Sequence, residues 1–464
     1  MKDTVTENNR NEAQYRRMTE TPIPQLVTAM SIPTIISMLI TVIYNTADTF
    51  FVSQINKSAS AAVGAVYAIM AIIQAFGCGV GVGAGSLISR RLGAKDNEAA
   101  NIYASSAFYC ATALGAILMV IGLLTLEPLL RLLGCSDTMM PHAIPYATFI
   151  LLAAPLNCAT FVLNYTLRSE GHARLAMIGV GTGGLLNVFL DPLFIFTLDM
   201  GTGGASLATI VSQAVSFSIL LTIFLTGHSA VKIRLKQVSR RLSDYRLIVT
   251  TGMPTVFRQG LGSVASAALN IQAIAYGGDA AGAAITIANK IYILVRNISL
   301  GLGQGFQPVA GYNYGAGKRR RTWQSFVFTV KIGTAICLVF SVVSALFARQ
   351  IINWFTDDAE VARLGMETIL LSAVAMPFLS LGTYVNMLYQ GLGFKTKAIF
   401  LASCRQGIFF LPAVILLPLV FGCLGVQAAQ PFADICTFAV SLPFSVAFYR
   451  NYIRGQADDL KKGE

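Results

Sequence analysis

The chain has 464 residues, of which 55% are hydrophobic and only 12% are charged, and its mean hydropathy is +0.63. Soluble domains carry roughly 25% charged residues, so this composition excludes an ordinary soluble protein and predicts that most of the surface faces lipid. The formal net charge of +12 could indicate a nucleic-acid partner, but it is spread over loops, as membrane topology requires, so we expect none.

Apolar stretches long enough to cross a bilayer, roughly 20 residues, recur along the chain. The first 20 residues precede them and are polar, without the apolar core of a signal peptide. The sequence therefore predicts an all-α membrane protein with twelve transmembrane helices. We place them near 24–54, 60–89, 101–126, 140–167, 174–198, 203–226, 247–276, 281–311, 322–348, 362–391, 396–421 and 424–450.

Positive charge alternates strongly between the predicted loops. Almost all Lys and Arg outside the spans fall on one side, which the positive-inside rule assigns to the cytoplasm. We expect a multi-pass protein of the inner or plasma membrane, with both termini cytoplasmic. Its predicted parts are a tail over 1–21, six spans over 22–226, a basic linker over 227–246 with a short surface helix, six spans over 247–454, and a tail over 455–464.

The two halves of the chain carry matching landmarks at offsets of 220 to 222 residues. Because each half has an even number of spans, both copies enter the membrane in the same orientation, as parallel repeats with a cavity between them. Glycines spaced by four in spans 2 and 8 predict close helix contacts. The matching landmarks are Pro33 and Pro254, Gly83-x-Gly85 and Gly303-x-Gly305, Pro155 and Pro377, Asn164 and Asn386, Gly171 and Gly393, and Gly204 and Gly425.

Three pairs of residues, each four positions apart, bring oxygen atoms to one face of spans 1, 5 and 6. At a helical rise of 1.5 Å per residue, all lie about 10–12 Å from the outer ends of their spans. Two carboxylates among neutral oxygens at one depth are typical of a proton or Na⁺ site, here at Asp48, Asp191 and Thr209. The pairs are Tyr44 with Asp48, Asn187 with Asp191, and Ala205 with Thr209.

The two acids are missing from the second copy. Asp48 aligns near Leu269 or Asn270, and Asp191 aligns near Leu411. An acid that only held the bundle together would have little reason to be lost from one half, so we favour an ion site over a structural role.

The second half carries an excess of positive charge within its spans. Arg405 and Asp434 fall at similar depth and are predicted to form a buried pair. Near the end of span 4, Glu170 is expected to pair with Arg168 or Arg174 rather than to contact substrate. A positive wall is unusual for a purely cationic substrate. The candidate substrate-cavity residues are Arg258, Gln259, Lys290, Arg296, Asn386 and Arg405.

Several short motifs also resemble the multidrug and toxic compound extrusion (MATE) transporters. They follow in the family's order over nearly the whole chain, and together they are specific. The motifs are YNTADTFFV at 44–52, SRRLGA at 89–94, RSEG at 168–171, NVFLDP at 187–192, GYNYGA at 311–316 and QGLG at 390–393.

This resemblance implies a V-shaped carrier that alternates between inward and outward openings and exports drugs or metabolites in exchange for H⁺ or Na⁺. We expect small organic substrates, a monomer and no cofactor. By similarity, the cation site of the N-terminal half comprises Asp48, Asn187, Asp191 and Thr209, with Tyr44 beside it and a carbonyl near Ala205. Some members carry acids in the other half, whereas span 7 here has Arg258 and Gln259.

Rival functions remain from the same superfamily and from other classes. A flippase for lipid-linked sugars or polysaccharides would suit a basic cavity, although its larger members have more than twelve spans. A membrane enzyme would need a catalytic motif such as H-E-x-x-H or G-x-S-x-G, which the sequence does not contain. A sensor or scaffold would not need buried acids.

Overall fold

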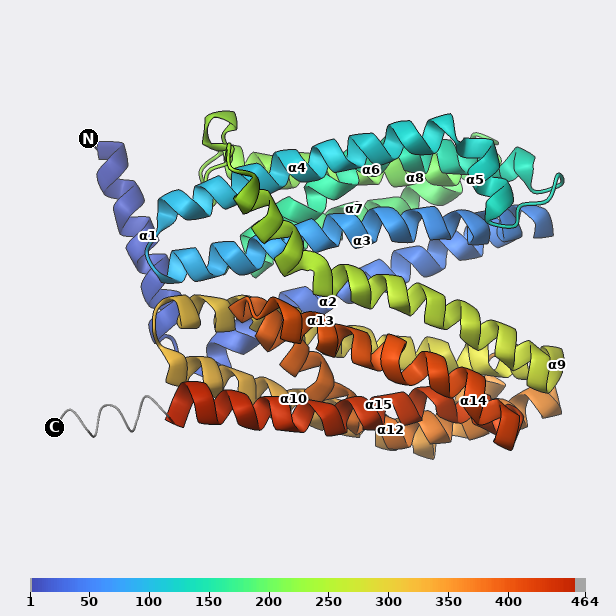
Figure 1. Ribbon diagram of the computed structural model, residues 1–464. Coiled ribbons are helices and arrows are strands. Elements are labelled where there is room, and N and C mark those ends of the chain that lie inside the picture. Colours follow the sequence, from blue (N-terminus) through green and yellow to red (C-terminus); the bar gives the residue numbers. More distant parts are fainter. Residues whose placement is uncertain (1, 455–464) are drawn as a thin grey trace.

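The computed structural model describes residues 2–454, and the regular elements within this range are all helical (Figure 1). The predicted tail at 455–464 lies outside the described residues. The elements are α1 Lys2–Glu20, α2 Ile23–Ser53, α3 Lys57–Gly93, α4 Asn97–Leu124, α5 Leu126–Leu132, α6 Met140–Ser169, α7 Ala173–Pro192, η1 Leu193–Thr197, α8 Gly201–Leu225, η2 Leu235–Gln237, α9 Leu242–Gly315, α10 Arg319–Leu346, α11 Ala348–Asn353, α12 Ala359–Leu392, α13 Lys395–Ser403, η3 Cys404–Phe410, α14 Leu411–Phe421, α15 Cys423–Phe448 and η4 Tyr449–Arg454.

The predicted membrane spans match these helices. Within residues 2–454, ten helical segments are long and apolar enough to cross a bilayer. The 74-residue α9 is not among these ten, but it divides into two further long helices at Gly278, whose φ of 63° and ψ of −165° are open only to glycine. The all-α fold of twelve spans in two repeats is therefore confirmed. The polar segment before the first span forms the helix α1.

The spans form two lobes, α2 to α8 and α9 to α15, which meet at the end of the molecule that carries α1 and diverge toward the other end (Figure 1). The internal repeat is visible in individual contacts. Asn164 donates to the carbonyl of Ala176 at 3.0 Å, and Asn386 donates to the carbonyl of Ala398 at 2.7 Å. The repeat thus places the same helix-to-helix hydrogen bond in both lobes.

The two lobes touch through glycine backbone at this closed end. A Cβ built on Gly83 of α3 would lie 2.9 Å from the backbone nitrogen of Gly252 in α9, and one on Gly305 of α9 would lie 2.5 Å from Cα of Ser31 in α2. Only glycine allows two helices to approach so closely. The N-terminal parts of α2 and α9 therefore each pack against the opposite lobe.

A second pair of glycines repeats this relation at the very end of the seam. A Cβ on Gly93 would meet the backbone of Tyr312 and Ala316, and one on Gly315 would lie 2.9 Å from Cα of Arg90. The side chain of Arg90 also donates to the carbonyl of Leu392 at 3.0 Å. We call these contacts of Gly83, Gly93, Gly305 and Gly315 the glycine seam.

The helix α1 and the turn after it bind both lobes beside the glycine seam. Glu12 accepts from Lys95 of the first lobe at 3.1 Å, and this hydrogen bond lowers the pKa of the Glu12 carboxyl. On the second lobe, Asn313 donates to the carbonyl of Met18 at 3.1 Å, and Arg321 donates to that of Thr21 at 2.6 Å. The segment therefore bridges the two lobes where they are closed.

Replacement of Gly83 by Ala tests whether the glycine seam holds the closed end together. The added methyl group would overlap the backbone of α9, so we expect a loss of roughly 1–3 kcal/mol of stability. Gly64→Ala is the control, because Gly64 lies on the same helix and a Cβ added there would have no other group within 4 Å. Thermal unfolding in detergent measures both. A Gly83→Ala protein as stable as Gly64→Ala would contradict the role of the seam.

Candidate functional site

A cavity of about 880 Å³ lies between the lobes and suits an organic ligand. Its lining runs from Arg168 and Gln304, near the glycine seam, to Ser53 and Ser60, where α2 ends and α3 begins. Arg168 donates to Gln304 across the lobes at 2.7 Å. The cavity is therefore closed toward α1 and extends toward the opposite end of the bundle.

Asp48 lies in the wall that the first lobe gives to this cavity. It is 9% exposed, and its Oδ2 accepts from the Tyr146 hydroxyl of α6 at 3.0 Å. Tyr44, one turn earlier on α2, also lines the cavity and packs against Gly184 of α7. The spacing of four residues thus places both groups on the face of α2 that meets the cavity and α7.

Asp191 lies deeper in the same lobe and is not part of the cavity lining. It is fully buried, and its Oδ1 accepts from Asn187 at 3.1 Å, one turn earlier on α7. Asn187 also donates to the Thr209 hydroxyl at 3.5 Å, and that hydroxyl donates to the Ala205 carbonyl at 3.2 Å. The structure therefore brings together all six residues that the sequence assigned to the ion site.

Three oxygen atoms of this group lack a hydrogen-bond donor among the described residues. They are Asp48 Oδ1, Asp191 Oδ2 and Asn187 Oδ1, all inaccessible to solvent. Buried acceptors without a partner cost free energy, and a proton or a cation would satisfy them. Asp48 and Asp191 also interact coulombically, so a positive charge between them would be stabilised by both. These oxygen donors suit H⁺ or Na⁺.

The helix that carries Asp191 changes form directly after it. Pro192 ends α7, and Leu193–Thr197 form a π-helix. Proline has no N–H to donate, so it disrupts the regular ladder at this point. The change of helix type next to a buried acid is typical of functional sites.

The second lobe contributes cations to the cavity wall. Arg258, Gln259, Lys290 and Arg296, all assigned to the cavity from the sequence, line it. The other two assigned residues are not in the lining. Asn386 accepts from Arg258 at 3.2 Å from behind the wall.

Arg405 is not in the cavity lining and instead pairs with a carboxylate of its own lobe. Its Nε donates to Asp434 at 2.6 Å, which confirms the predicted buried pair. The Tyr292 hydroxyl and Gln430 also donate to Asp434, at 2.5 and 3.1 Å. Arg405 lies in the π-helix η3, which joins α13 to α14 near mid-span.

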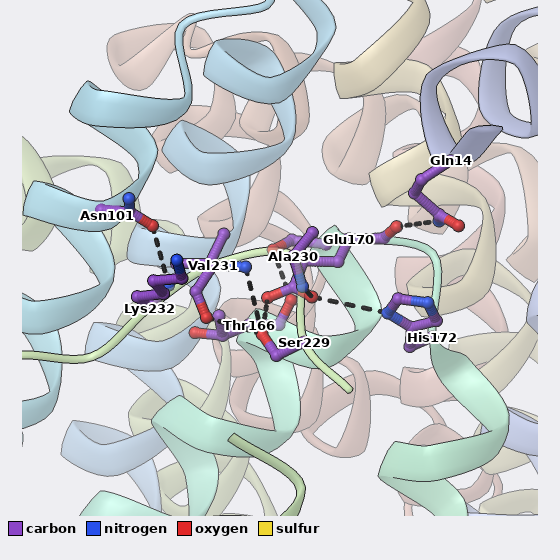
Figure 2. Close-up of polar contacts among 10 residues, drawn as sticks. Gln14, Asn101, Thr166, Glu170, His172, Ser229, Ala230, Val231 and Lys232 are labelled. Atoms are coloured by element: carbon purple, nitrogen blue, oxygen red, sulfur yellow. Dashed lines mark hydrogen bonds and ion pairs between the residues drawn. The ribbon is translucent and has the colours of Figure 1, made fainter. Parts of the chain in front are cut away.

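Glu170 does not form the ion pair that the sequence predicted with Arg168 or Arg174. Its carboxylate is fully buried and accepts from the Ser229 hydroxyl at 2.7 Å and the Ala230 backbone at 2.8 Å, both in the linker (Figure 2). The ring of His172 lies 3.4 Å away. The prediction was wrong because the linker folds back onto α6 and supplies closer donors, which sequence spacing could not reveal.

A row of polar residues on α4 holds the rest of the linker. Asn101 accepts from the backbone of Lys232 at 2.7 Å (Figure 2), and Ser105 accepts from that of Arg234 at 3.0 Å. The linker is therefore bound along its backbone to the first lobe. The short helix expected within it is the 3₁₀ turn η2.

Sequence reasoning missed Tyr146, Arg168 and Gln304 as parts of the cavity. Tyr146 is fully buried on α6. Its hydroxyl group within an apolar span is the one feature of the sequence that could have indicated a functional role. Arg168 and Gln304 meet across the lobes, so their contact depends on the closed end of the molecule.

The MatE family model matches residues 33–193 and 254–415, one match in each lobe. The chain belongs to the MatE family. It is 27% identical over 426 residues to the multidrug export protein MepA of Staphylococcus saprophyticus subsp. saprophyticus, covering 89% of this chain and 91% of that protein. It is 25% identical to MepA of a Staphylococcus aureus strain, over 91% and 94% of the two chains.

Solved transporter structures share the fold. A multidrug resistance MATE transporter of the MOP superfamily in an outward-facing conformation matches with a TM-score of 0.89 and 27% identity, over 96% of this chain and 98% of that one. A MOP superfamily transporter from Pyrococcus furiosus matches with a TM-score of 0.89 and 27% identity, over 94% of this chain and 98% of that one. Its binding pocket is described as having reverse polarity, which suggests a different function. The curated MepA relatives of this MatE protein are transporters rather than enzymes.

Replacement of Glu170 by Ala tests whether this carboxylate fastens the linker. The change removes the acceptor for Ser229 and Ala230, so trypsin should cut the basic linker faster. Asp137→Ala is the control, because Asp137 is 86% exposed and pairs only with Arg131 among the described residues. The appearance of two half-length fragments on a gel measures the rate. Equal rates for the two variants would show that Glu170 does not hold the linker.

Proposed function

We propose that this MatE protein exports amphipathic organic compounds, drugs among them, in exchange for H⁺ or Na⁺ by alternating access. It would act as a monomer in the inner or plasma membrane, with α1 and the linker on the cytoplasmic side. The lobes would be 22–226 and 247–454, joined by 227–246. No cofactor or nucleic acid enters this function.

The observation that carries the proposal is the group of unsatisfied oxygens beside the cavity. Asp48, Asn187 and Thr209 reach the cavity wall, while Asp191 lies one layer behind them and accepts from Asn187. An ion could thus enter from the cavity at Asp48 and be held by both acids. Carboxylates at this depth in a membrane protein are costly unless they bind a partner that function requires.

The glycine seam supports alternating access. At one end glycines let the lobes touch closely, and the Ser31 hydroxyl donates to the Leu302 carbonyl across them at 3.1 Å, whereas the lobes diverge at the other end. The hydrogen bonds of Arg168 to Gln304 and of Arg90 to Leu392 would have to break for the lobes to rock to the opposite opening. The multidrug export function of the MepA relatives supports organic substrates.

A lipid-linked or polysaccharide flippase is the second candidate, because four cations line the cavity and would suit phosphate groups. Liposomes containing the protein separate the two. Dye efflux driven by a proton or a sodium gradient supports the antiporter and shows which ion is coupled. Gradient-independent movement of a fluorescent lipid-linked sugar between leaflets would favour the flippase.

Asn replacements of the two acids test ion coupling. Asp48→Asn combined with Asp191→Asn keeps the size of both side chains and removes their charge, so gradient-driven export should fall to the level of protein-free liposomes. The control is Asp199→Asn, an exposed acid with a left-handed φ of 51° that Asn also tolerates. Dye efflux is compared between liposomes that contain equal amounts of each inserted variant.

If the double variant inserts into the membrane and exports dye as well as the wild type, the two acids have no role in the coupling mechanism. Loss of export in Asp199→Asn would show that the assay responds to acids in general rather than to this site.

A further inference from the structure

The charges that line the cavity are unequal in number. Asp48 is the one acid in its lining among the described residues, and the cations are Arg168, Arg258, Lys290 and Arg296. The acid lies in the first lobe and already accepts from Tyr146. Three of the cations lie in the second lobe, opposite it.

The cations of the cavity have neutral partners in place of carboxylates. Arg168 donates to the amide oxygen of Gln304, and Arg258 donates to that of Asn386. Neither arginine lies within ion-pair distance of an acid in the part of the chain that the structure describes. A neutral amide satisfies a donor but leaves the charge uncompensated.

Arg296 is the one arginine of the cavity lining that makes no side-chain hydrogen bond within residues 2–454, whereas Arg168 and Arg258 each donate to an amide. Its Nε is buried, and it has no hydrogen-bond partner within residues 2–454. The Lys290 ammonium lies nearer the periphery, 5.9 Å from the ring of Phe355. Arg296 therefore presents a guanidinium to the cavity with open hydrogen-bonding capacity.

Asp434, the one buried acid of the second lobe among the described residues, does not neutralise this wall. Asp434 already accepts from Arg405, Tyr292 and Gln430. Arg258, Arg296 and Arg405 carry like charges and repel one another, and the single charge of Asp434, which also attracts Arg296, offsets only one of the three. The positive potential therefore persists at Arg258 and Arg296 and would repel a cationic ligand in these low-dielectric surroundings.

We propose that Arg258 and Arg296 bind the oxyanion of an amphipathic substrate, a carboxylate, sulfonate or phosphate. Guanidinium groups pair with such oxyanions through two parallel hydrogen bonds. Tyr67, Phe161 and Ile293, which also line the cavity, would contact the apolar part of the ligand. The proposal rests on the proposed export function and names its substrate class. The coupling ion and the anion occupy opposite lobes, so their exchange proceeds through lobe movement.

Equilibrium binding to the purified protein in detergent tests this without any gradient. Two xanthene dyes of similar size serve as probes, carboxyfluorescein as the anion and rhodamine 6G as the cation, and fluorescence anisotropy measures their affinity. Carboxyfluorescein should bind more tightly, and rising salt should weaken it. Tighter binding of rhodamine 6G to the wild-type protein would overturn the proposal.

Arg258→Gln and Arg296→Gln should each weaken carboxyfluorescein binding about tenfold or more, because each removes charge-assisted hydrogen bonds. Arg296→Lys keeps the positive charge and should retain the preference for the anion. Arg349→Gln is the control, since Arg349 is exposed on α11 and lies outside the cavity lining. Unchanged affinity in both folded Gln variants would also overturn the proposal. The dye comparison in the wild-type protein stands even if a variant fails to fold.

Competition and transport complete the design. Displacement of carboxyfluorescein by short-chain phosphatidylglycerol supports a lipid phosphate as the natural oxyanion, and displacement by octanesulfonate alone supports a free amphipathic anion. Dye export from liposomes is measured separately. Selective anion binding without gradient-driven export of either dye would reject the antiporter but keep the anion site. Gradient-driven export of rhodamine 6G alone would support the antiporter but reject the anion site.

Discussion

The backbone contact between the lobes at the glycine seam is the constraint on which the rest of the structure depends. Gly83 and Gly305 let α2 and α9 cross into the opposite lobe, and Gly93 and Gly315 repeat the contact at its end. Because the lobes meet so closely there, they diverge toward the other end and leave a cavity of about 880 Å³. For this end to open, the glycine contacts and the hydrogen bonds that cross them, such as Arg168 to Gln304, would have to separate.

The duplicated lobes share a scaffold but differ in electrostatics. Asn164 and Asn386 make the same hydrogen bond in each lobe, which fixes equivalent helices in equivalent places. On that shared frame, the first lobe holds Asp48 and Asp191 with unsatisfied oxygens. The second holds Arg258 and Arg296 without a carboxylate partner in the described chain. In a low-dielectric environment each imbalance favours a ligand of opposite sign, so one duplicated bundle can serve two different ligands.

The sequence predicted most of the fold, because its signals are local or periodic. The length of the apolar stretches predicted the spans, and the constant offset between landmarks such as Pro33 and Pro254 predicted the repeat. Helical spacing placed Asn187 beside Asp191 and Ala205 beside Thr209, and equal depth along three spans placed them near Asp48. The buried pair of Arg405 and Asp434 could be predicted in the same way, since depth in the membrane is readable from distance to the span ends.

What the sequence by itself determined is therefore the number of spans, the duplication, and the depth and helical face of each polar residue. Only the tertiary structure decided what lies opposite each face. Three hydrogen bonds join residues that are between 59 and 136 positions apart, namely Tyr146 with Asp48, Gln304 with Arg168, and Ser229 with Glu170. Rotation and packing of whole helices select such partners, and helical periodicity carries no information about which face of a neighbouring helix will meet them.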